Sequence, residues 1–449
     1  MGGKHYFPLT DQDRQEMLYV IGAASVEDLF KDIPESVRFK GELDLPPAMS
    51  EPETLKHLQE LAGKNKHSQN MVSFLGAGIY DHFIPAVIKH VTGRSEFYTS
   101  YTPYQPEVSQ GVLQAIFEYQ TMICQLTGMD VANASMYDGG TAVTEGAIMG
   151  CGATRREKVL VSRSVSPFYR AVIKNYFLSR GLQLQEIPLR DGCTDREQLA
   201  EMLGDDVATV VLQQPNFFGM VENMNGLAEL IHEQKAVFLV AADPISLGLL
   251  QTPAEYGADI VVGEGQCLGV PASFGGPVLG IMAAREKFVR QMPGRIAGET
   301  VDSEGNRGFV LTLQTREQHI RREKAASNIC SNEALVALAA SVYLAVMGPQ
   351  GLREVAEQCL QKTAYAREQI MALKDYSLTF PGINFKEFAV TVPGDPTELN
   401  RKLLEQNILG GVDISSYYPE LQNTMLFAFT EKRTRNEIDT LVTELEGWK

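Results

Sequence analysis

Short apolar runs alternate with amphipathic stretches through the middle of this 449-residue chain, and the alternation predicts repeated strand–helix–strand units. Strands are predicted at 158–162, 182–189, 207–213, 236–242, 259–262 and 277–283, and helices at 167–180, 196–203 and 222–235. The run AVFLVAA at 236–242 is apolar at every position, which suits a sheet covered on both faces. The pattern therefore predicts an α/β fold with a large, doubly wound, mostly parallel sheet.

The two ends of the chain differ from this middle region. Residues 11–31 are predicted to form one helix, and the Pro-rich stretch 40–52 indicates an extended arm that either wraps a partner or links elements. From about residue 335 the pattern predicts long helices with a few strands. We expect three parts: a helix and arm at 1–65, the large α/β domain at 66–334, and a smaller C-terminal α+β domain at 335–449.

Composition narrows the functional classes. The formal net charge of −16 argues against nucleic acid or an anionic membrane as the main partner, because both require a basic face. The six cysteines form no CxxC pair and the seven histidines show no ligand spacing, so we expect no disulfide frame and no metal site. No apolar signal core or run of about 18 apolar residues is present, which indicates a cytoplasmic protein.

Two short segments have the chemistry of a cofactor site. Asp243 directly follows the apolar run, where a carboxylate either pairs with the pyridine nitrogen of pyridoxal phosphate (PLP) or caps a turn before Pro244. Asp138, Gly139, Gly140 and Thr141 lead into an apolar helical run. This segment is either a phosphate cradle at a helix N-terminus or an ordinary capped helix start.

A PLP enzyme also needs a lysine for its Schiff base. That lysine is expected one strand beyond the aspartate, near the sequence GEGQ at 263–266. No lysine occurs from residue 236 to residue 286, and Gln266, whose amide cannot form an imine, stands at the expected place. The frame of a PLP site is thus predicted without its reactive amine.

Two further segments are candidates for contacts with a ligand or partner. The loop FYTSYTPYQP at 97–106 combines aromatic rings, hydroxyls and an amide, and is either such a contact or a packed connector. The charged run at 316–324 is predicted to be helical. It is either a solvated face or a site that binds carboxylates through its arginines.

Together these segments resemble the P-protein (glycine decarboxylase) family of the glycine cleavage system, and more narrowly the α subunit of its split prokaryotic form. The resemblance covers essentially the whole chain. It is most specific in FYTSYTPYQPEVSQGVLQAIFEYQTMICQLTGMDVANASMYDGGTA (97–142) and LQTREQHIRREKAASNICSN (313–332), and extends over 24–34, 74–88, 293–302 and 416–431. Ser166, Gly140 and Thr144 depart from the family pattern, which weakens the expectation that this chain's own pocket holds PLP.

The resemblance implies the aminotransferase-like fold of PLP enzymes of fold type I. It implies glycine decarboxylation with transfer of the aminomethyl group to the lipoyl arm of H-protein and release of CO2. PLP would be bound covalently to a sister β subunit, in an assembly expected to be α2β2. Gln266 would replace the Schiff-base lysine, Asp243 would be the pyridine-facing aspartate, and residues 138–141 would be a vestigial phosphate loop.

Three hypotheses follow for the role of this chain. In the first, it supplies part of the active-site wall at the interface with the β subunit, and the residues expected there are Tyr101, Tyr104, Gln105, Arg316 and Gln318. In the second, it is a non-catalytic scaffold or regulatory pseudoenzyme of the same complex. In the third, it is a self-contained PLP enzyme that uses another lysine, such as Lys89 or Lys324.

Overall fold

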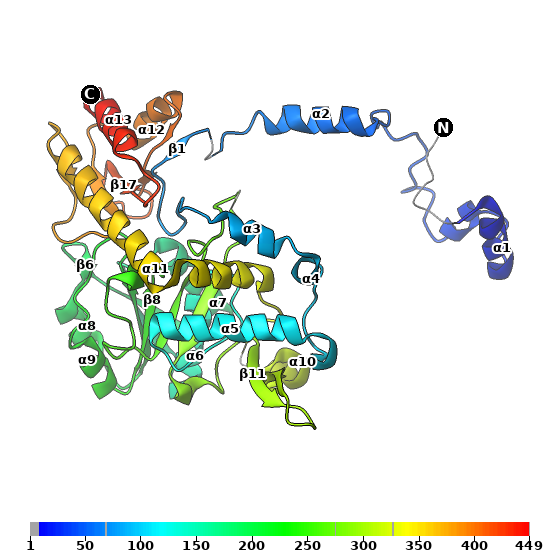
Figure 1. The fold of residues 1–449 in the computed structure, drawn as a ribbon, viewed down its shortest axis with the longest axis horizontal. Helices are drawn as coiled ribbons and strands as arrows, with labels where there is room; N and C mark the ends of the chain where they lie inside the picture. The colour runs from blue at the N-terminus through cyan, green and yellow to red at the C-terminus, as the bar shows by residue number, and fades with distance from the viewer. Residues whose placement is uncertain (1–8, 68–69, 274, 326, 449) are drawn as a thin grey trace. The chain divides into compact units, whose positions relative to one another are not determined.

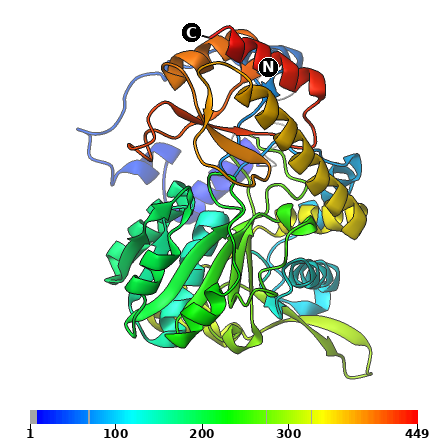
Figure 2. The same ribbon diagram turned by 90° about the vertical axis from the view of Figure 1, so that its left-hand side faces the viewer.

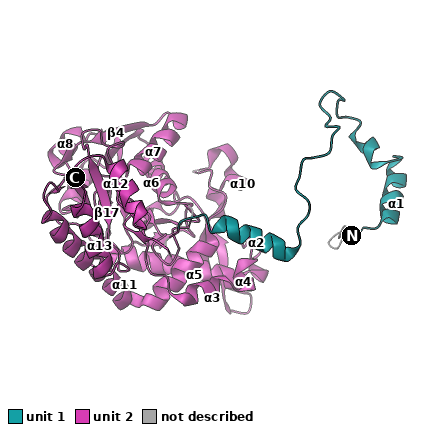
Figure 3. Ribbon diagram, turned by 90° about the horizontal axis from the view of Figure 1, so that it is seen from above, with its two compact units in different colours: residues 1–66 teal, residues 67–449 magenta. Residues whose placement is uncertain are grey.

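The structure is a computed structural model that describes residues 9–67, 70–273, 275–325 and 327–448. The chain divides into two compact units, residues 1–66 and 67–449 (Figure 3). The first unit contains α1 (Asp11–Ile21), the 3-10 helix η1 (Val26–Phe30) and α2 (Glu51–Ala62), and none of these elements buries a residue. The prediction of one helix over 11–31 is wrong, because Gly22 takes a left-handed φ of 80° and ends α1.

The second unit is built on a seven-stranded sheet with the order β2-β10-β9-β8-β7-β3-β4 (Figures 1 and 2). Its strands are β2 (Val131–Ala132), β3 (Lys158–Ser162), β4 (Gln183–Ile187), β7 (Val207–Gln214), β8 (Val237–Ala242), β9 (Ile260–Glu264) and β10 (Gly280–Ala284). The pairs β3–β4, β3–β7, β7–β8 and β8–β9 are parallel, and β10 is antiparallel to both of its neighbours. The predicted mostly parallel sheet is confirmed.

Helices cover both faces of this sheet. Alternate side chains such as Val159 and Val161 pack with α6 (Gly139–Thr154) and α7 (Pro167–Arg180) on one face. Intervening side chains such as Leu160 and Leu212 pack in a second core on the other face. That core includes residues of α5 (Gln110–Thr127), α8 (Arg196–Met202), α9 (Leu227–Glu233) and α11 (Ala334–Met371). Each fully buried aliphatic side chain contributes about 1.5–3 kcal/mol, so the two cores fix the sheet firmly.

Three predicted elements differ from the structure. The strand expected over 182–189 is split at Pro188, and the helix expected over 222–235 begins only after Gly226, which has a left-handed φ of 76°. The helix expected over 316–324 is broken into η5 (Gln314–Arg316), α10 (Gln318–Arg321) and η6 (Arg322–Lys324). Arg322 has a φ of 53°, which interrupts the helical hydrogen bonds.

The C-terminal part of the second unit carries a four-stranded antiparallel sheet. Its strands, in spatial order, are β13 (Ser377–Leu378), β14 (Glu387–Thr391), β17 (Thr424–Ala428) and β16 (Val412–Asp413), accompanied by α12 (Pro396–Glu405) and α13 (Arg435–Glu446). This arrangement has the α+β character predicted from the sequence. The predicted boundary at residue 335 stays a prediction, since residues 67–449 group as one compact unit.

Helix α11 enters this region along the core of the unit. Among the described residues it is the one helix long and apolar enough to cross a membrane, but Val336, Ala340 and Tyr343 on it are buried in the protein core. It is interrupted at Gly348, which has a φ of 60° and precedes Pro349.

The remaining elements are short. They are β1 (Val72–Ser73), α3 (Ala86–Thr92), α4 (Ser95–Tyr98), η2 (Pro106–Val108), β5 (Leu189–Arg190), β6 (Cys193–Thr194), η3 (Ser246–Gly248), η4 (Glu286–Phe288), β11 (Ile296–Val301), β12 (Arg307–Thr312) and β15 (Ile408–Leu409).

Candidate functional site

The carboxyl ends of β8 and β9 meet at one edge of the large sheet, where ligands bind in folds of this class. Asp243 follows β8, and Glu264 ends β9. Both line a cavity of about 40 Å³ together with Tyr80, Tyr169 and Cys267. The sequence prediction thus placed Asp243 and the GEGQ segment correctly at the same edge.

The two carboxylate oxygens of Asp243 have different roles. Oδ1 accepts hydrogen bonds from the backbone N–H groups of Ile245 and Ser246, at 2.9 and 3.3 Å, as in an ordinary turn. Oδ2 forms an ion pair with Nζ of Lys386, whose side chain is 1% exposed. Nζ also lies 3.6 Å from the centroid of the Tyr80 ring. The aspartate therefore faces a cation, and that cation is a lysine of this chain.

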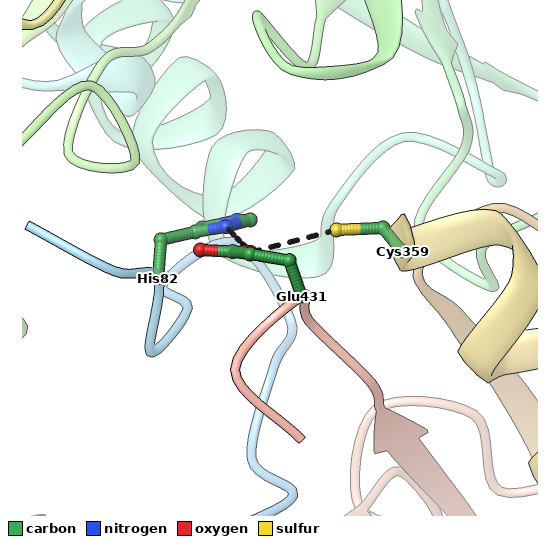
Figure 4. Close-up of side chains that lie close together, drawn as sticks. All are labelled: His82, Cys359 and Glu431. Carbon is green, nitrogen blue, oxygen red and sulfur yellow. Dashed lines mark hydrogen bonds and ion pairs between the residues drawn. The ribbon is translucent and has the colours of Figure 1, made fainter. Parts of the chain in front are cut away.

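Lys386 continues into a buried chain of polar groups, of which Figure 4 shows His82, Cys359 and Glu431. Its Nζ lies 3.4 Å from Nε2 of His82, and Nδ1 of His82 lies 2.6 Å from Oε2 of Glu431. Because an ammonium can only donate, Nε2 accepts and Nδ1 donates. The thiol of Cys359 donates to the same Glu431 oxygen at 3.7 Å.

The donor atoms of His82, Cys359 and Glu431 lie within 4.8 Å of one another, as they would around a metal ion. Their hydrogen bonds indicate a hydrogen-bond network instead of a metal site. Burial would raise the pKa of Glu431, but the hydrogen bonds from His82 and from the Phe83 N–H hold it at about 2. Burial raises the pKa of the Cys359 thiol, and the ammonium of Lys386 opposes a second cation beside His82. The arrangement is a proton-donating network that ends on one carboxylate.

The start of α6 has the geometry of a capped helix. Asp138 is the N-cap, and its Oδ1 accepts from the Thr141 N–H at 2.9 Å. The anion at this N-terminus is Glu264, whose Oε2 accepts from the Gly139 N–H at 3.0 Å. Oε1 of Glu264 accepts from the N–H groups of Gln266 and Leu279, both at 2.9 Å. Burial raises the pKa of Glu264 to about 7 despite these three donors.

Gln266 is bound on both sides of its amide. Its Oε1 accepts from the Tyr80 N–H at 3.0 Å, and its Nε2 donates to the carbonyls of Tyr80 and Val270 at 3.1 and 2.6 Å. The side chain is 1% exposed and clamps the segment that contains Tyr80 and His82. A lysine offers no acceptor, so it could not replace this pair of contacts.

The residues of this pocket do not fit PLP. Pockets that bind small molecules and cofactors usually measure about 300–1,000 Å³. The cavity that Asp243 lines measures about 40 Å³. An adjacent cavity of about 370 Å³ is lined by Asp138, Gly140, Ser166 and Glu264 among others, and the described residues that line it include no basic side chain. A cofactor phosphate there would face two carboxylates.

The expected wall residues lie elsewhere, around residues 294–295. Tyr104 Oη accepts from Nη2 of Arg295 at 2.9 Å, and Arg316 donates through Nη2 to the Gly294 carbonyl at 3.0 Å. Tyr101 is 82% exposed, with its ring centroid 6.4 Å from that of Tyr104. Gln105 and Gln318 are exposed. The structure therefore brings Tyr104 and Arg316 to one place and leaves Gln105 and Gln318 on the surface.

Arg295 is the residue that sequence reasoning missed at this second location. It is 3% exposed, and its Nε and Nη1 have no hydrogen-bond partner among the described residues. Nη1 of Arg316 is likewise buried without a partner there, and burial lowers the pKa of Arg316. A lone arginine in PGRIAG, between a Pro-Gly turn and an apolar strand, was the available signal.

Lys386 and Glu264 were also not identified from the sequence as residues of the pocket beside Asp243. Lys386 stands in NFKEFAV, where a lysine inside an apolar stretch is unusual. Glu264 stands within the GEGQ segment itself. The pairing of Lys386 with Asp243 joins residues 143 positions apart, since 386 − 243 = 143, and no local pattern reports such a contact.

The fold defines the class of protein. It is that of PLP-dependent enzymes of fold type I. A sphingosine-1-phosphate lyase from Burkholderia pseudomallei K96243 superposes with a TM-score of 0.65 over 92% of this chain and 94% of its own, at 13% identity. At that identity the likeness concerns the fold alone, and it confirms the predicted fold class.

The family follows from closer relatives. A family model described as glycine cleavage system P-protein matches residues 4–445. A protein of Moorella thermoacetica named probable glycine dehydrogenase (decarboxylating) subunit 1 is 56% identical over 442 residues, which cover 98% of this chain and 99% of the relative. A crystal structure of glycine decarboxylase (P-protein) of the glycine cleavage system, in inhibitor-bound form, superposes with a TM-score of 0.91 at 44% identity, over 98% of this chain and 99% of that one. The chain belongs to the glycine cleavage system P-protein family.

Proposed function

We propose that this chain is one subunit of a glycine dehydrogenase (decarboxylating) and is active only with a sister subunit. Together the two decarboxylate glycine, pass the aminomethyl group to the lipoyl arm of H-protein and release CO2. The sister β subunit carries PLP on its lysine, in an α2β2 assembly in the prokaryotic cytoplasm. The relatives named subunit 1 and the acidic charge support a protein partner and no nucleic acid or membrane partner.

The observation that carries this proposal is the bonding of Gln266. The amide in the lysine's place is held by the backbone of Tyr80 and Val270, and no lysine occurs from 236 to 286. Lys89 and Lys324 are both exposed and neither lines the cavity beside Asp243. Lys386 does lie at this pocket, but its amine is held in an ion pair with Asp243 and covered by the Tyr80 ring. We therefore expect the reactive amine of the covalent PLP chemistry to come from another chain.

This chain contributes wall residues to the partner's active site. Those residues are Tyr101, Tyr104, Gln105, Arg316 and Gln318, and they orient the glycine carboxylate and the lipoyl arm and exclude water. Tyr104 and Arg316 are pre-positioned by contacts to Arg295 and Gly294. The exposed Gln105 sits on the same loop as Tyr104 and is free to meet a second chain.

The test measures exchange of the glycine carboxyl carbon with bicarbonate. The full chain and its sister subunit are assayed separately and together, each with added PLP and H-protein. Activity is expected only in the mixture. Exchange by this chain alone with PLP would overturn the proposal.

A second assay separates a wall from a scaffold. Gln105→Ala is expected to lower exchange at unchanged assembly, measured by size-exclusion chromatography of the mixture. Gln406→Ala, at an exposed position after α12, is the matched control and should leave both unchanged. If Gln105→Ala and Tyr104→Phe both retain full exchange, the chain is a scaffold and the wall assignment is wrong.

A further inference from the structure

Two charged side chains of this chain lie where a PLP enzyme would bind its cofactor. Lys386 lies beside Asp243, and Glu264 lies at the N-terminus of α6. We propose that Lys386 is an internal substitute for the protonated pyridine nitrogen opposite Asp243, and that Glu264 is an internal substitute for the phosphate at the N-terminus of α6. The pocket is thereby closed by the protein itself, and restoring a lysine at position 266 does not restore PLP binding. This inference rests on the proposed function in placing the working cofactor on the sister subunit.

The cationic half rests on the surroundings of Asp243. A buried carboxylate is costly without a partner, and in a PLP enzyme the protonated ring nitrogen can be that partner. Here the ion pair with Lys386 satisfies Oδ2, and Nζ is covered by the Tyr80 ring at 3.6 Å. A second cation could not reach Oδ2 without displacing Lys386, because Tyr80 and Asp243 line the same cavity of about 40 Å³.

The inference for Glu264 rests on the backbone donors around its carboxylate. Gly139 lies at the start of α6, whereas Gln266 follows β9 and Leu279 precedes β10. The three backbone N–H groups of Gly139, Gln266 and Leu279 all point at the Glu264 carboxylate, at 2.9–3.0 Å. The space above Gly139 is filled as well, because a Cβ built there would lie 2.3 Å from Oη of Tyr169. A phosphate at the start of α6 would find the Gly139 N–H already in use and would meet the Glu264 carboxylate.

Gln266 holds both Glu264 and the residue that covers Lys386 in place. Gln266 donates one of the N–H groups that hold Glu264, and its side chain holds the backbone of Tyr80, which covers Lys386. The cation, the anion and the amide therefore support one another. Opening the pocket requires changes at three positions: 264, 266 and 386.

The first experiment uses borohydride reduction with PLP, followed by peptide mapping of the purified full chain. The variants are wild type, Gln266→Lys, and the triple variant Gln266→Lys/Glu264→Ala/Lys386→Met. Near-stoichiometric pyridoxyl labelling at position 266 is expected in the triple variant only. Equal labelling at that position in Gln266→Lys alone, or labelling of Lys386 in the wild type, would overturn the proposal.

The second experiment covers the case in which the triple variant does not fold. Melting temperatures of wild type and Glu264→Ala are measured with and without inorganic phosphate, with Glu405→Ala, an exposed glutamate, as control. Phosphate is expected to raise the Tm of Glu264→Ala by at least about 2 °C more than it raises that of the wild type or the control. Equal shifts in all three proteins would reject the anionic half.

The exchange assay on wild-type chain and sister subunit remains a separate test of the proposed function. One outcome is that the two wild-type subunits together fail to exchange carboxyl carbon while the variants of this chain still show the predicted labelling and phosphate response. That result would reject the proposed function and leave the further inference standing. A pair that exchanges normally, with labelling of Gln266→Lys alone, would reject the internal substitutes alone.

Discussion

Tyr104 lies over the guanidinium of Arg295, with 5.3 Å from Cζ to the ring centroid, and its hydroxyl accepts a hydrogen bond from Nη2 at 2.9 Å. Tyr104 is 49% exposed, whereas Arg295 is buried. The tyrosine thus connects a surface loop to a buried cation whose Nε and Nη1 have no partner among the described residues. This contact fixes the position of a half-exposed ring on the 97–106 loop, and the role of that loop in binding a second chain stays a prediction.

The first prediction concerns this contact. Tyr104→Phe keeps the ring but removes the acceptor of a hydrogen bond from a charged donor, worth about 1.5–3 kcal/mol. Expressed in the active assembly, this loss should lower carboxyl exchange by about tenfold or more at unchanged assembly. Tyr98→Phe, at a position 70% exposed, is the control and should be silent. A loss of assembly that parallels the loss of exchange would instead indicate a purely structural role.

The second prediction concerns the buried ion pair. Lys386→Met leaves the Asp243 carboxylate without its cation, and breaking such a pair costs about 3–5 kcal/mol of unfolding free energy. The double variant Lys386→Met/Asp243→Asn should recover part of that loss, because no unpaired charge remains. Urea denaturation measures both. Arg353→Met, in an exposed pair with Glu357, should cost no more than about 0.5 kcal/mol. Equal losses of unfolding free energy in Lys386→Met and Arg353→Met would contradict this prediction.

The sequence predicted the frame of the pocket well, because its parts are local. The run AVFLVAA marks β8 by composition, and Asp243 follows it directly. The helix at Pro167–Arg180 was predicted with its observed bounds, since Pro at its start and Gly181 at its end are local signals. The absence of lysine from 236 to 286 needed only counting.

The occupants of the pocket were not predictable in this way. Lys386 reaches Asp243 from just before β14, and Glu431 reaches His82 from just beyond β17. Only the tertiary fold, which brings the C-terminal part of the chain to the end of β8, places these residues together. The sequence also left the helix start at Asp138 ambiguous between a phosphate cradle and a capped helix. The Gly139 N–H donates to Glu264 at the end of β9, so this donor at the helix start is in use.

The third prediction is a pH dependence that follows from Glu387. This carboxyl accepts from Tyr80 Oη at 2.5 Å and from the Ala77 N–H at 2.9 Å, and burial raises its pKa from 4.5 to about 7. A raised folded-state pKa gives stability that is full below about pH 4.5 and is lost as the pH rises to 7. That loss is about 3 kcal/mol as an order of magnitude.

The variant Glu387→Gln tests this sign. The free energy of unfolding, measured from pH 4.5 to 7.5, should fall less steeply with pH in the variant than in the wild type. Glu264 adds a slope of the same sign, because its pKa is also raised to about 7. Glu431 acts in the opposite sense below pH 4.5, since its pKa is held at about 2. An unchanged slope in Glu387→Gln would mean that this carboxyl does not titrate in the interval.

The last prediction uses the glycines of α6, which packs closely on the large sheet. A Cβ at Gly150 would lie 2.1 Å from Oγ1 of the buried Thr209 on β7, so Gly150→Ala must push the helix off the sheet. Overpacking of this kind costs about 1–3 kcal/mol. Gly152, two residues further along the same helix, has no atom of the described residues within 4 Å of its Cβ position, apart from its chain neighbours and the backbone of its own helix. Gly152→Ala should therefore stabilise the helix by up to about 1 kcal/mol, through helix propensity alone. Opposite signs in urea denaturation are expected, and a loss of stability in both variants would mean that α6 does not rest on the sheet through its glycine face.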